Sequence, residues 1–231
     1  MRRLLLRAYA TLMLLAAACV LGACTTPAQL AMALIPDGTL SVLMSHFERE
    51  VSTNRKRVAE LEQKGDWPGL VKFAEDNIAK DPRTAAWWMV KGYAHSQQKQ
   101  HANAIAAFGE MVSLEPNAPD AWNLLAQEHR NAGDPHRALV VLDNAMLALR
   151  DSPTTFVLLG DTLTDLSRHE EALRAYRQAI ELNDGLASAW SGYASSLIRL
   201  GRVKEAEEVA VKMEKGWPEL ARGIRQNLKK P

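Results

Sequence analysis

Residues of the same type recur every 34 positions along most of this 231-residue chain. A fixed period of this length constrains a fold more strongly than any local pattern. Three series share it: the aromatic residues Trp88, Trp122, Phe156 and Trp190, the alanines Ala104, Ala138, Ala172 and Ala206, and the small residues Gly92, Ala126, Gly160 and Ala194. The period predicts an array of similar units that bury one continuous core by stacking.

Each unit reads as two helices joined by a turn. The aromatic residue and the small residue are four positions apart, which places them one turn apart on the same face of a first helix. The alanine opens the apolar stripe of a second helix. The period and these residue types resemble the tetratricopeptide repeat, a helix–turn–helix unit. This resemblance implies an all-α fold, a right-handed tetratricopeptide superhelix (α-solenoid).

The repeat also suggests how the chain is divided. Asn54 stands at the aromatic position and Leu70 at the alanine position of the first unit, so we interpret that unit as a degenerate N-terminal cap. The predicted divisions are N-terminal helices with a degenerate repeat at 39–84, repeats at 85–118, 119–152, 153–186 and 187–220, and a C-terminal capping helix at 218–231.

Packing expectations follow from the same series. The alanine of the second helix allows close approach to the small residue of the first, and a larger side chain there would overpack the contact. Trp88, Trp122 and Trp190 are expected in the core by their periodicity. Trp87 has no place in the period, and it either packs against the degenerate unit or forms an exposed anchor for a partner.

The N-terminus has the pattern of a secretory signal peptide over residues 1–23, with arginines ahead of an apolar run and small residues at its end. Leu21-Gly22-Ala23-Cys24 resembles the lipobox of bacterial lipoproteins. The resemblance implies cleavage before Cys24 and lipidation of that residue, whereas the alternative is an ordinary signal peptide cut nearby. Residues 24–38 are then expected to form a lipidated tether.

Several acyl chains on Cys24 would anchor the protein to a membrane without spanning it. Thr25 follows the cysteine, and the resemblance to sorted lipoproteins, which carry aspartate there when retained at the inner membrane, implies the outer membrane. The expected location is the bacterial envelope, lipid-anchored and facing the periplasm. Cys19 leaves with the signal, so the mature chain is expected to contain no disulfide.

No sequence motif indicates catalysis. The chain has no phosphate-binding glycine loop, no Gly-x-Ser-x-Gly elbow and no His-Glu-x-x-His helix. His95 and His129 share one repeat position, where we expect partly buried packing residues because adjacent units hold their ligands too far apart for one zinc. A net charge of +1 gives no argument for nucleic acid. We therefore expect no enzyme, no metal, no cofactor and no small-molecule substrate.

Candidate binding residues come from the resemblance. In the family, the first helix of each unit lines a concave groove and its outward positions contact the partner. Carried over, these positions are Tyr93, Gln97, Asn123, Gln127, Arg130, Asn131, Asp161, Asp165 and Arg199. The amides are suited to hydrogen-bond an extended peptide, and Arg130 would add its charge. Asp161 and Asp165, one turn apart, are expected to form an acidic patch, with an acid/base pair or a cation site as the alternative.

Two functions remain open at this level. The first is a scaffold or assembly factor that binds another envelope protein, through a peptide or loop held in the groove. The second is an adaptor that holds or regulates a cell-wall or exopolysaccharide enzyme, or secretion or pilus machinery.

Overall fold

The computed structural model describes residues 50–149 and 151–228, and within these ranges the chain is all-helical. The prediction of an all-α fold is confirmed. The predicted signal peptide, Cys24, the tether and the start of the 39–84 segment lie outside the described residues. The helices are α4 Glu50–Gln63, α5 Trp67–Ile78, α6 Ala85–Gln97, α7 His101–Leu114, α8 Pro119–Asn131, α9 Pro135–Ala148, α10 Pro153–Asp165, α11 His169–Leu182, α12 Ala187–Arg199, α13 Val203–Met213 and α14 Pro218–Leu228.

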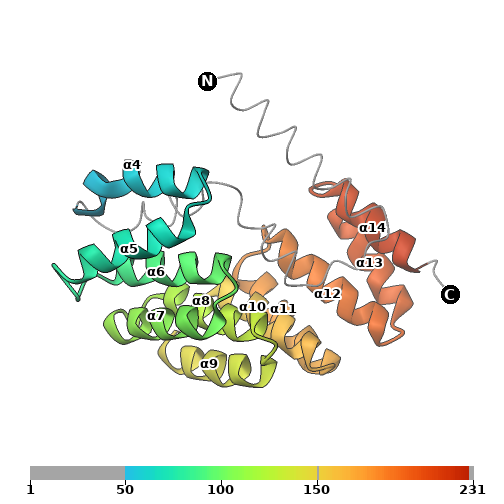
Figure 1. Ribbon diagram of the computed structural model, residues 1–231. Helices are drawn as coiled ribbons and strands as arrows, with labels where there is room; N and C mark the ends of the chain where they lie inside the picture. The colour runs from blue at the N-terminus through green and yellow to red at the C-terminus, as the bar shows by residue number, and fades with distance from the viewer. Residues whose placement is uncertain (1–49, 150, 229–231) are drawn as a thin grey trace.

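The helices follow one another as a stacked array, from α4 at one end to α13 and α14 at the other (Figure 1). Helices α6 and α7 lie within residues 85–118, and the following pairs lie within 119–152, 153–186 and 187–220. Each helix packs on its neighbour in sequence, and the first helices of successive units also meet, as α8 and α10 do. The array is a solenoid because every unit contacts chiefly the units beside it.

Local chemistry explains where several helices begin. Asp66 and Asp134 accept hydrogen bonds from backbone amides three residues later, at 2.9 and 3.0 Å. Ser152 caps α10 in the same way through the amide of Thr155. Proline occupies the first turn of α5, α8, α9 and α10, where its missing N–H costs no intrahelical bond.

One backbone conformation recurs at the turn of every unit. Positive φ angles occur at five positions spaced by 34 residues: Gly65 (64°), Lys99 (58°), Gly133 (78°), Ser167 (58°) and Gly201 (72°). The sequence shows glycine at only three of them, yet all five adopt the left-handed conformation. The degenerate first unit therefore has the same turn as the regular units. Lys99 and Ser167 are strained there, because a Cβ disfavours this conformation.

We expect Ser167→Gly to raise the free energy of unfolding by about 1 kcal/mol, because glycine removes the steric cost at positive φ. Lys99→Gly should act in the same direction, and Gly133→Ser should lower stability by a similar amount. Urea denaturation of the three variants checks the sign. Destabilisation by both glycine substitutions would show that the serine and lysine side chains stabilise the turn.

The core contains the repeating small residues. Ala104, Ala138, Ala172 and Ala206 are all fully buried. The structure adds a match that the sequence analysis missed: the small residue of the first helix makes room for a large residue of the second. Gly92 faces the Phe108 ring and Gly160 faces the Tyr176 ring, whereas Ala126 lies in one cluster with the aliphatic Leu142.

The periodic tryptophans, expected in the core, are only partly buried at its edge. Trp88, Trp122 and Trp190 are half-buried, and each indole N–H donates to the carbonyl six residues earlier, at 2.8–2.9 Å. The indole therefore ties the first helix to the loop before it. Trp87 is 5% exposed and packs edge-to-face on Phe73 of α5, with ring centroids 5.6 Å apart. Of the two alternatives for Trp87, packing against the degenerate unit is correct.

Candidate functional site

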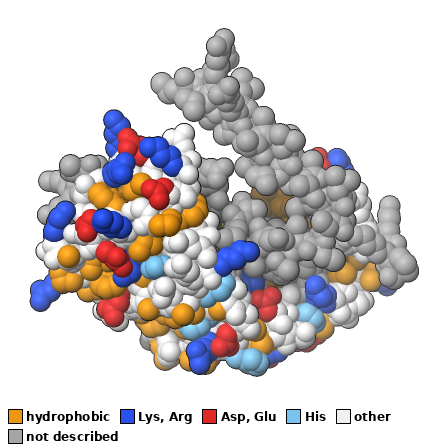
Figure 2. Space-filling model, in the orientation of Figure 1, with side chains coloured by type: hydrophobic (Ala, Val, Ile, Leu, Met, Phe, Trp, Pro, Cys, Tyr) orange, Lys and Arg blue, Asp and Glu red, His pale blue; other side chains and the backbone are white. Residues whose placement is uncertain are grey.

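The nine predicted groove residues all come from the first helices of the units, α6, α8, α10 and α12. Side-chain contacts join these helices across the units: Asn123 Nδ2 donates to Thr154 at 3.3 Å, and Arg130 of α8 reaches Asp165 of α10. We call the surface that these nine residues define the groove face. On the side of the molecule shown in Figure 2, acidic and basic side chains are intermixed over the N-terminal helices.

Arg130 does not point outward as predicted. Its side chain is 2% exposed, Nε donates to Asp165 Oδ2 at 2.8 Å, and Nη1 donates to Gln127 at 3.0 Å. Nη1 also lies 3.7 Å from Asp161 Oδ2. The guanidinium is thus buried between two carboxylates, so it presents no free charge to a partner. The expectation of a charge contact at Arg130 is wrong because the next unit supplies its counter-ions.

Asp161 is the second centre of this network. The Tyr176 hydroxyl of α11 donates to Asp161 Oδ1 at 2.6 Å. Although the side chain is 31% exposed, its carboxyl is enclosed by Tyr176 and Arg130. Burial raises the pKa of Asp161 above the ordinary aspartate value, and the charge of Arg130 and the hydrogen bond from Tyr176 oppose this shift. Both carboxylates therefore serve as partners of Arg130, which differs from the expected acidic patch.

The amides of the groove face are half-buried and partly engaged. Gln127 Nε2 donates to Asn131 at 2.9 Å, and Asn131 donates to Glu128 at 3.2 Å. Gln97 forms no hydrogen bond with any residue that the structure describes, and the Asn123 Oδ1 atom has no such partner either. Gln97 therefore keeps hydrogen-bonding capacity for another molecule, whereas the unpaired Asn123 oxygen is itself buried.

The remaining predicted residues lie toward the two ends of the groove face. Tyr93 packs edge-to-face on Trp67 and its hydroxyl donates to Glu62 at 3.2 Å. Arg199 of α12 is exposed and has no ion pair within the described ranges. The nine residues therefore divide into an internally paired centre and two ends with different chemistry.

A buried carboxylate was missed by the sequence analysis. The Glu128 side chain is 2% exposed and accepts hydrogen bonds from Ser96 at 2.6 Å and from His101 Nδ1 at 2.6 Å. His101, the first residue of α7, is therefore half-buried and paired. The available signal was that the three other regular units place Ala94, Thr162 and Ser196 at the repeat position of Glu128.

His95 and His129 are packing residues, as expected from their shared position. They are 8% and 9% exposed, and His95 Nδ1 contacts Gln100 at 2.7 Å. Burial lowers the pKa of His129 below the ordinary histidine value. In the described part of the chain, no three His, Cys, Asp or Glu side chains gather as a metal site would require.

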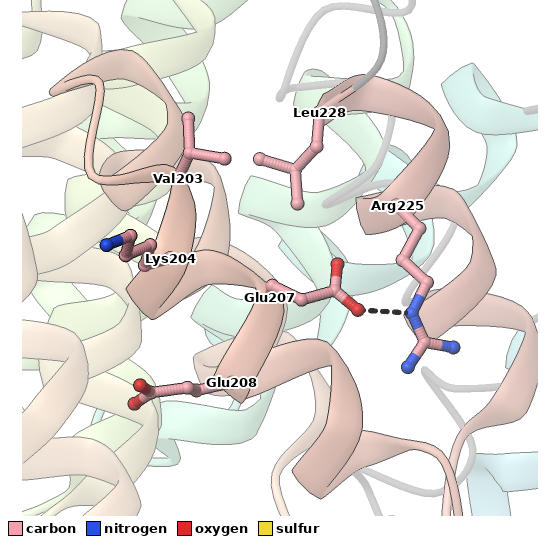
Figure 3. Close-up of a pocket in the computed structure, with 6 residues that line it drawn as sticks. All are labelled: Val203, Lys204, Glu207, Glu208, Arg225 and Leu228. Atoms are coloured by element: carbon pink, nitrogen blue, oxygen red, sulfur yellow. Dashed lines mark hydrogen bonds and ion pairs between the residues drawn. The ribbon is translucent and has the colours of Figure 1, made fainter.

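The C-terminal end carries an open cavity of about 600 Å³ between α13 and α14 (Figure 3). Its lining combines Val203 and Leu228 with four charged residues. Arg225 donates to Glu207 at 2.7 Å and to Glu214 at 3.2 Å, which ties α14 to α13. Two of the four charged lining residues, Arg225 and Glu207, therefore hold the capping helix against α13. No helix of the described residues has the length and apolar character needed to cross a membrane.

Comparison with known protein families agrees with this geometry. The family model described as "Tetratricopeptide repeat" matches residues 157–219, and the model described as "Anaphase-promoting complex, cyclosome, subunit 3" matches residues 97–179. Among curated proteins, Superkiller complex protein 3 of Mus musculus is 24% identical over 120 residues, which are 52% of this chain and 8% of the relative. PEX5-related protein of Homo sapiens is 30% identical over 82 residues, 36% of this chain and 13% of the relative.

Solved structures match more of the chain. MamA 41-end from Desulfovibrio magneticus RS-1 has a TM-score of 0.60 at 15% identity, covering 80% of this chain and 99% of that one. A thermophilic tetratricopeptide repeat protein of Thermus thermophilus has a TM-score of 0.58 at 17% identity, covering 75% and 96%. YrrB, described as having an unusual peptide-binding site, has a TM-score of 0.57 at 17% identity, covering 73% and 88%.

The fold is a tetratricopeptide repeat solenoid, and residues 157–219 match the tetratricopeptide repeat family model. Proteins with this fold generally act as non-catalytic protein–protein interaction scaffolds. This chain spans only 8% and 13% of the length of these two curated relatives. The activities of those relatives are therefore not assigned to this chain.

Proposed function

We propose that this protein is a lipid-anchored scaffold or assembly factor of the bacterial envelope, which binds an extended segment of another envelope protein on its groove face. The observation that carries the proposal is the half-buried amide of Gln97, which forms no hydrogen bond with the described residues, on the same face as the amide of Asn123. A peptide backbone offers both N–H and C=O groups, so amide side chains can pair with it regardless of its sequence. The peptide-binding description of YrrB supports the same use of this fold.

Paired substitution of the two amides tests the binding surface. Gln97→Ala with Asn123→Ala should weaken capture of envelope partners by crosslinking and pull-down, while stability falls by no more than about 1 kcal/mol, because the pair loses only the 3.3 Å hydrogen bond from Asn123 to Thr154 among the described residues. Gln178→Ala with Asn144→Ala makes the same chemical change on exposed positions of the second helices and is the control. Equal capture by both double variants and the wild type would place the binding surface elsewhere.

The anchoring part of the proposal depends on the lipobox-like segment at Leu21 to Cys24. The lipid chains would hold the repeat array at a membrane surface, because two or more acyl chains bind a bilayer stably. A scaffold held in this way would meet partners in the envelope and not in the cytoplasm.

Cys24→Ser should abolish acyl labelling and release the protein from the membrane fraction, or leave it unprocessed, because serine cannot form the thioether. Cys19→Ser changes the same residue type inside the predicted signal peptide and should leave both readouts unchanged. Membrane fractionation with palmitate labelling measures the effect. Unchanged labelling of the Cys24→Ser variant would rule out the lipoprotein assignment.

A further inference from the structure

Four repeat positions come together at one joint, the contact between two consecutive units. In the joint between units 85–118 and 119–152 these positions are Ser96, His101, Glu128 and Asn131. All three neighbours donate hydrogen bonds to the Glu128 carboxylate, at 2.6, 2.6 and 3.2 Å. The repeat position of His101, at the start of a second helix, therefore supplies an N–H donor that points at a carboxylate.

The same positions recur 68 residues later, in the joint between units 153–186 and 187–220. They hold Thr164, His169, Ser196 and Arg199, so the histidine is kept and the glutamate is replaced by serine. Both His169 Nδ1 and Ser196 Oγ are buried and have no hydrogen-bond partner among the residues that the structure describes. Ser196 itself is fully buried. His169 thus occupies the same donor position as His101, but it lacks the carboxylate acceptor that His101 has in Glu128.

Side-chain length explains the two unpaired atoms. A serine hydroxyl ends two bonds short of a glutamate carboxylate, so Ser196 cannot make the contact that Glu128 makes. Leaving a buried donor unpaired costs about 1–3 kcal/mol, which favours any group that can pair with it. The other two joints hold Trp67 with Ala94 and Pro135 with Thr162, so they lack the histidine.

A positively charged residue occupies the fourth position of this joint, and an open cavity lies beside its histidine. Arg199 stands at the position of Asn131, and it is exposed and without an ion pair within residues 50–149 and 151–228. An open cavity of about 240 Å³ borders His169, and the rest of its lining comes from Leu200 and the start of α11 rather than from Ser196 or Arg199. The two acids on its rim are already paired, Glu171 with Arg168 at 2.6 Å and Glu170 with Arg202 at 3.6 Å.

We propose that this joint binds a carboxylate of the partner protein, held by His169, Ser196 and Arg199 in the place that the Glu128 carboxylate occupies in the equivalent joint. Histidine N–H and arginine form charge-assisted hydrogen bonds with carboxylates, and serine adds a neutral one. The inference rests on the proposed function for the source of the carboxylate. The carboxylate belongs to an acidic side chain or to a chain terminus, and the same donors suit both.

Acetate titration of the full chain in detergent tests the site itself, with the ring-nitrogen NMR signal of His169 as the readout. We expect a saturable shift of His169 with acetate and none with chloride at the same ionic strength. His101, whose partner is already present, is the internal control. Absence of a saturable shift at His169, or an equal shift at His101, overturns the proposal.

Two reciprocal substitutions exchange the glutamate and the serine between the two joints. Ser196→Glu supplies the missing carboxylate, so it should abolish the acetate response of His169 and raise the melting temperature. Glu128→Ser should lower the melting temperature and make His101 sensitive to acetate. An acetate response that survives Ser196→Glu contradicts the proposal, even if either variant also changes stability.

Blocked peptides distinguish the two sources. One peptide carries an internal glutamate and an amidated end, a second carries a free C-terminus and no acid, and a third carries neither. A shift of the His169 signal with the first peptide identifies an acidic side chain as the source, and a shift with the second identifies a chain terminus. A response to acetate but to none of the peptides rejects a partner carboxylate. Loss of partner capture in Ser196→Glu but not in the Gln97/Asn123 double variant would refute the groove-face function while leaving this site standing.

Discussion

Replacement of Arg130 by glutamate is expected to lower the free energy of unfolding by about 3–5 kcal/mol, the usual cost of breaking a buried ion pair from one side. The substitution places a carboxylate beside Asp161 and Asp165, where the guanidinium now lies 2.8 Å from Asp165. Because the Arg130 side chain is 2% exposed, water cannot reach the new charge without opening the contact between α8 and α10. Urea denaturation of the variant measures the loss.

Arg199→Glu is the matched control, since it makes the same charge change at an exposed position of another first helix. It should change stability by no more than about 0.5 kcal/mol. The stability loss in Arg130→Met should lie between those of Arg130→Glu and Arg199→Glu, because the two carboxylates that remain are partly exposed and can be hydrated. Equal effects of Arg130→Glu and Arg199→Glu would mean that Arg130 is not buried in solution.

Gly92→Ala is expected to destabilise the protein, although alanine is the better helix former. A Cβ on Gly92 would lie 2.5 Å from Cε1 of Phe108, and overpacking of a core costs about 1–3 kcal/mol. Gly109→Ala makes the same substitution inside α7, where the added Cβ meets no atom within 4 Å, and should gain about 1 kcal/mol from helix propensity. The two variants, compared by thermal denaturation, should therefore differ in sign.

The pairing of Gly92 with Phe108 can also be tested by exchange. Gly92→Ala combined with Phe108→Leu copies the Ala126 and Leu142 combination of the next unit. We expect the double variant to be more stable than the sum of the two single changes predicts, by about 0.5–3 kcal/mol of coupling. Additive effects would show that the two positions do not share one packing constraint.

The predicted groove residues show what reasoning from sequence could place and what it could not. Periodicity placed Gln97 and Asn123 on first helices, because a 34-residue repeat determines which turn of which helix a residue occupies. It did not reveal that Arg130 turns inward, since that depends on two carboxylates supplied by the next unit. The burial of Glu128 was missed for the same reason: its partners Ser96 and His101 come from the preceding unit.

The turn positions give the same lesson for the backbone. Gly133 and Gly201 indicated turns in two units, but Lys99 and Ser167 concealed the same left-handed conformation. Residue type alone does not predict positive φ for lysine or serine, because the unit around the turn imposes it at a steric cost.

The amino-acid sequence by itself determined the helical class, the repeat unit and the positions of the small residues, because each depends on spacing along one chain and on local helix geometry. The tertiary structure alone decided which polar side chains are buried, which are paired and which are left without a partner. Those outcomes depend on side chains from neighbouring units meeting across a joint, where a difference of two bonds between Glu128 and Ser196 separates a filled hydrogen-bond site from an open one.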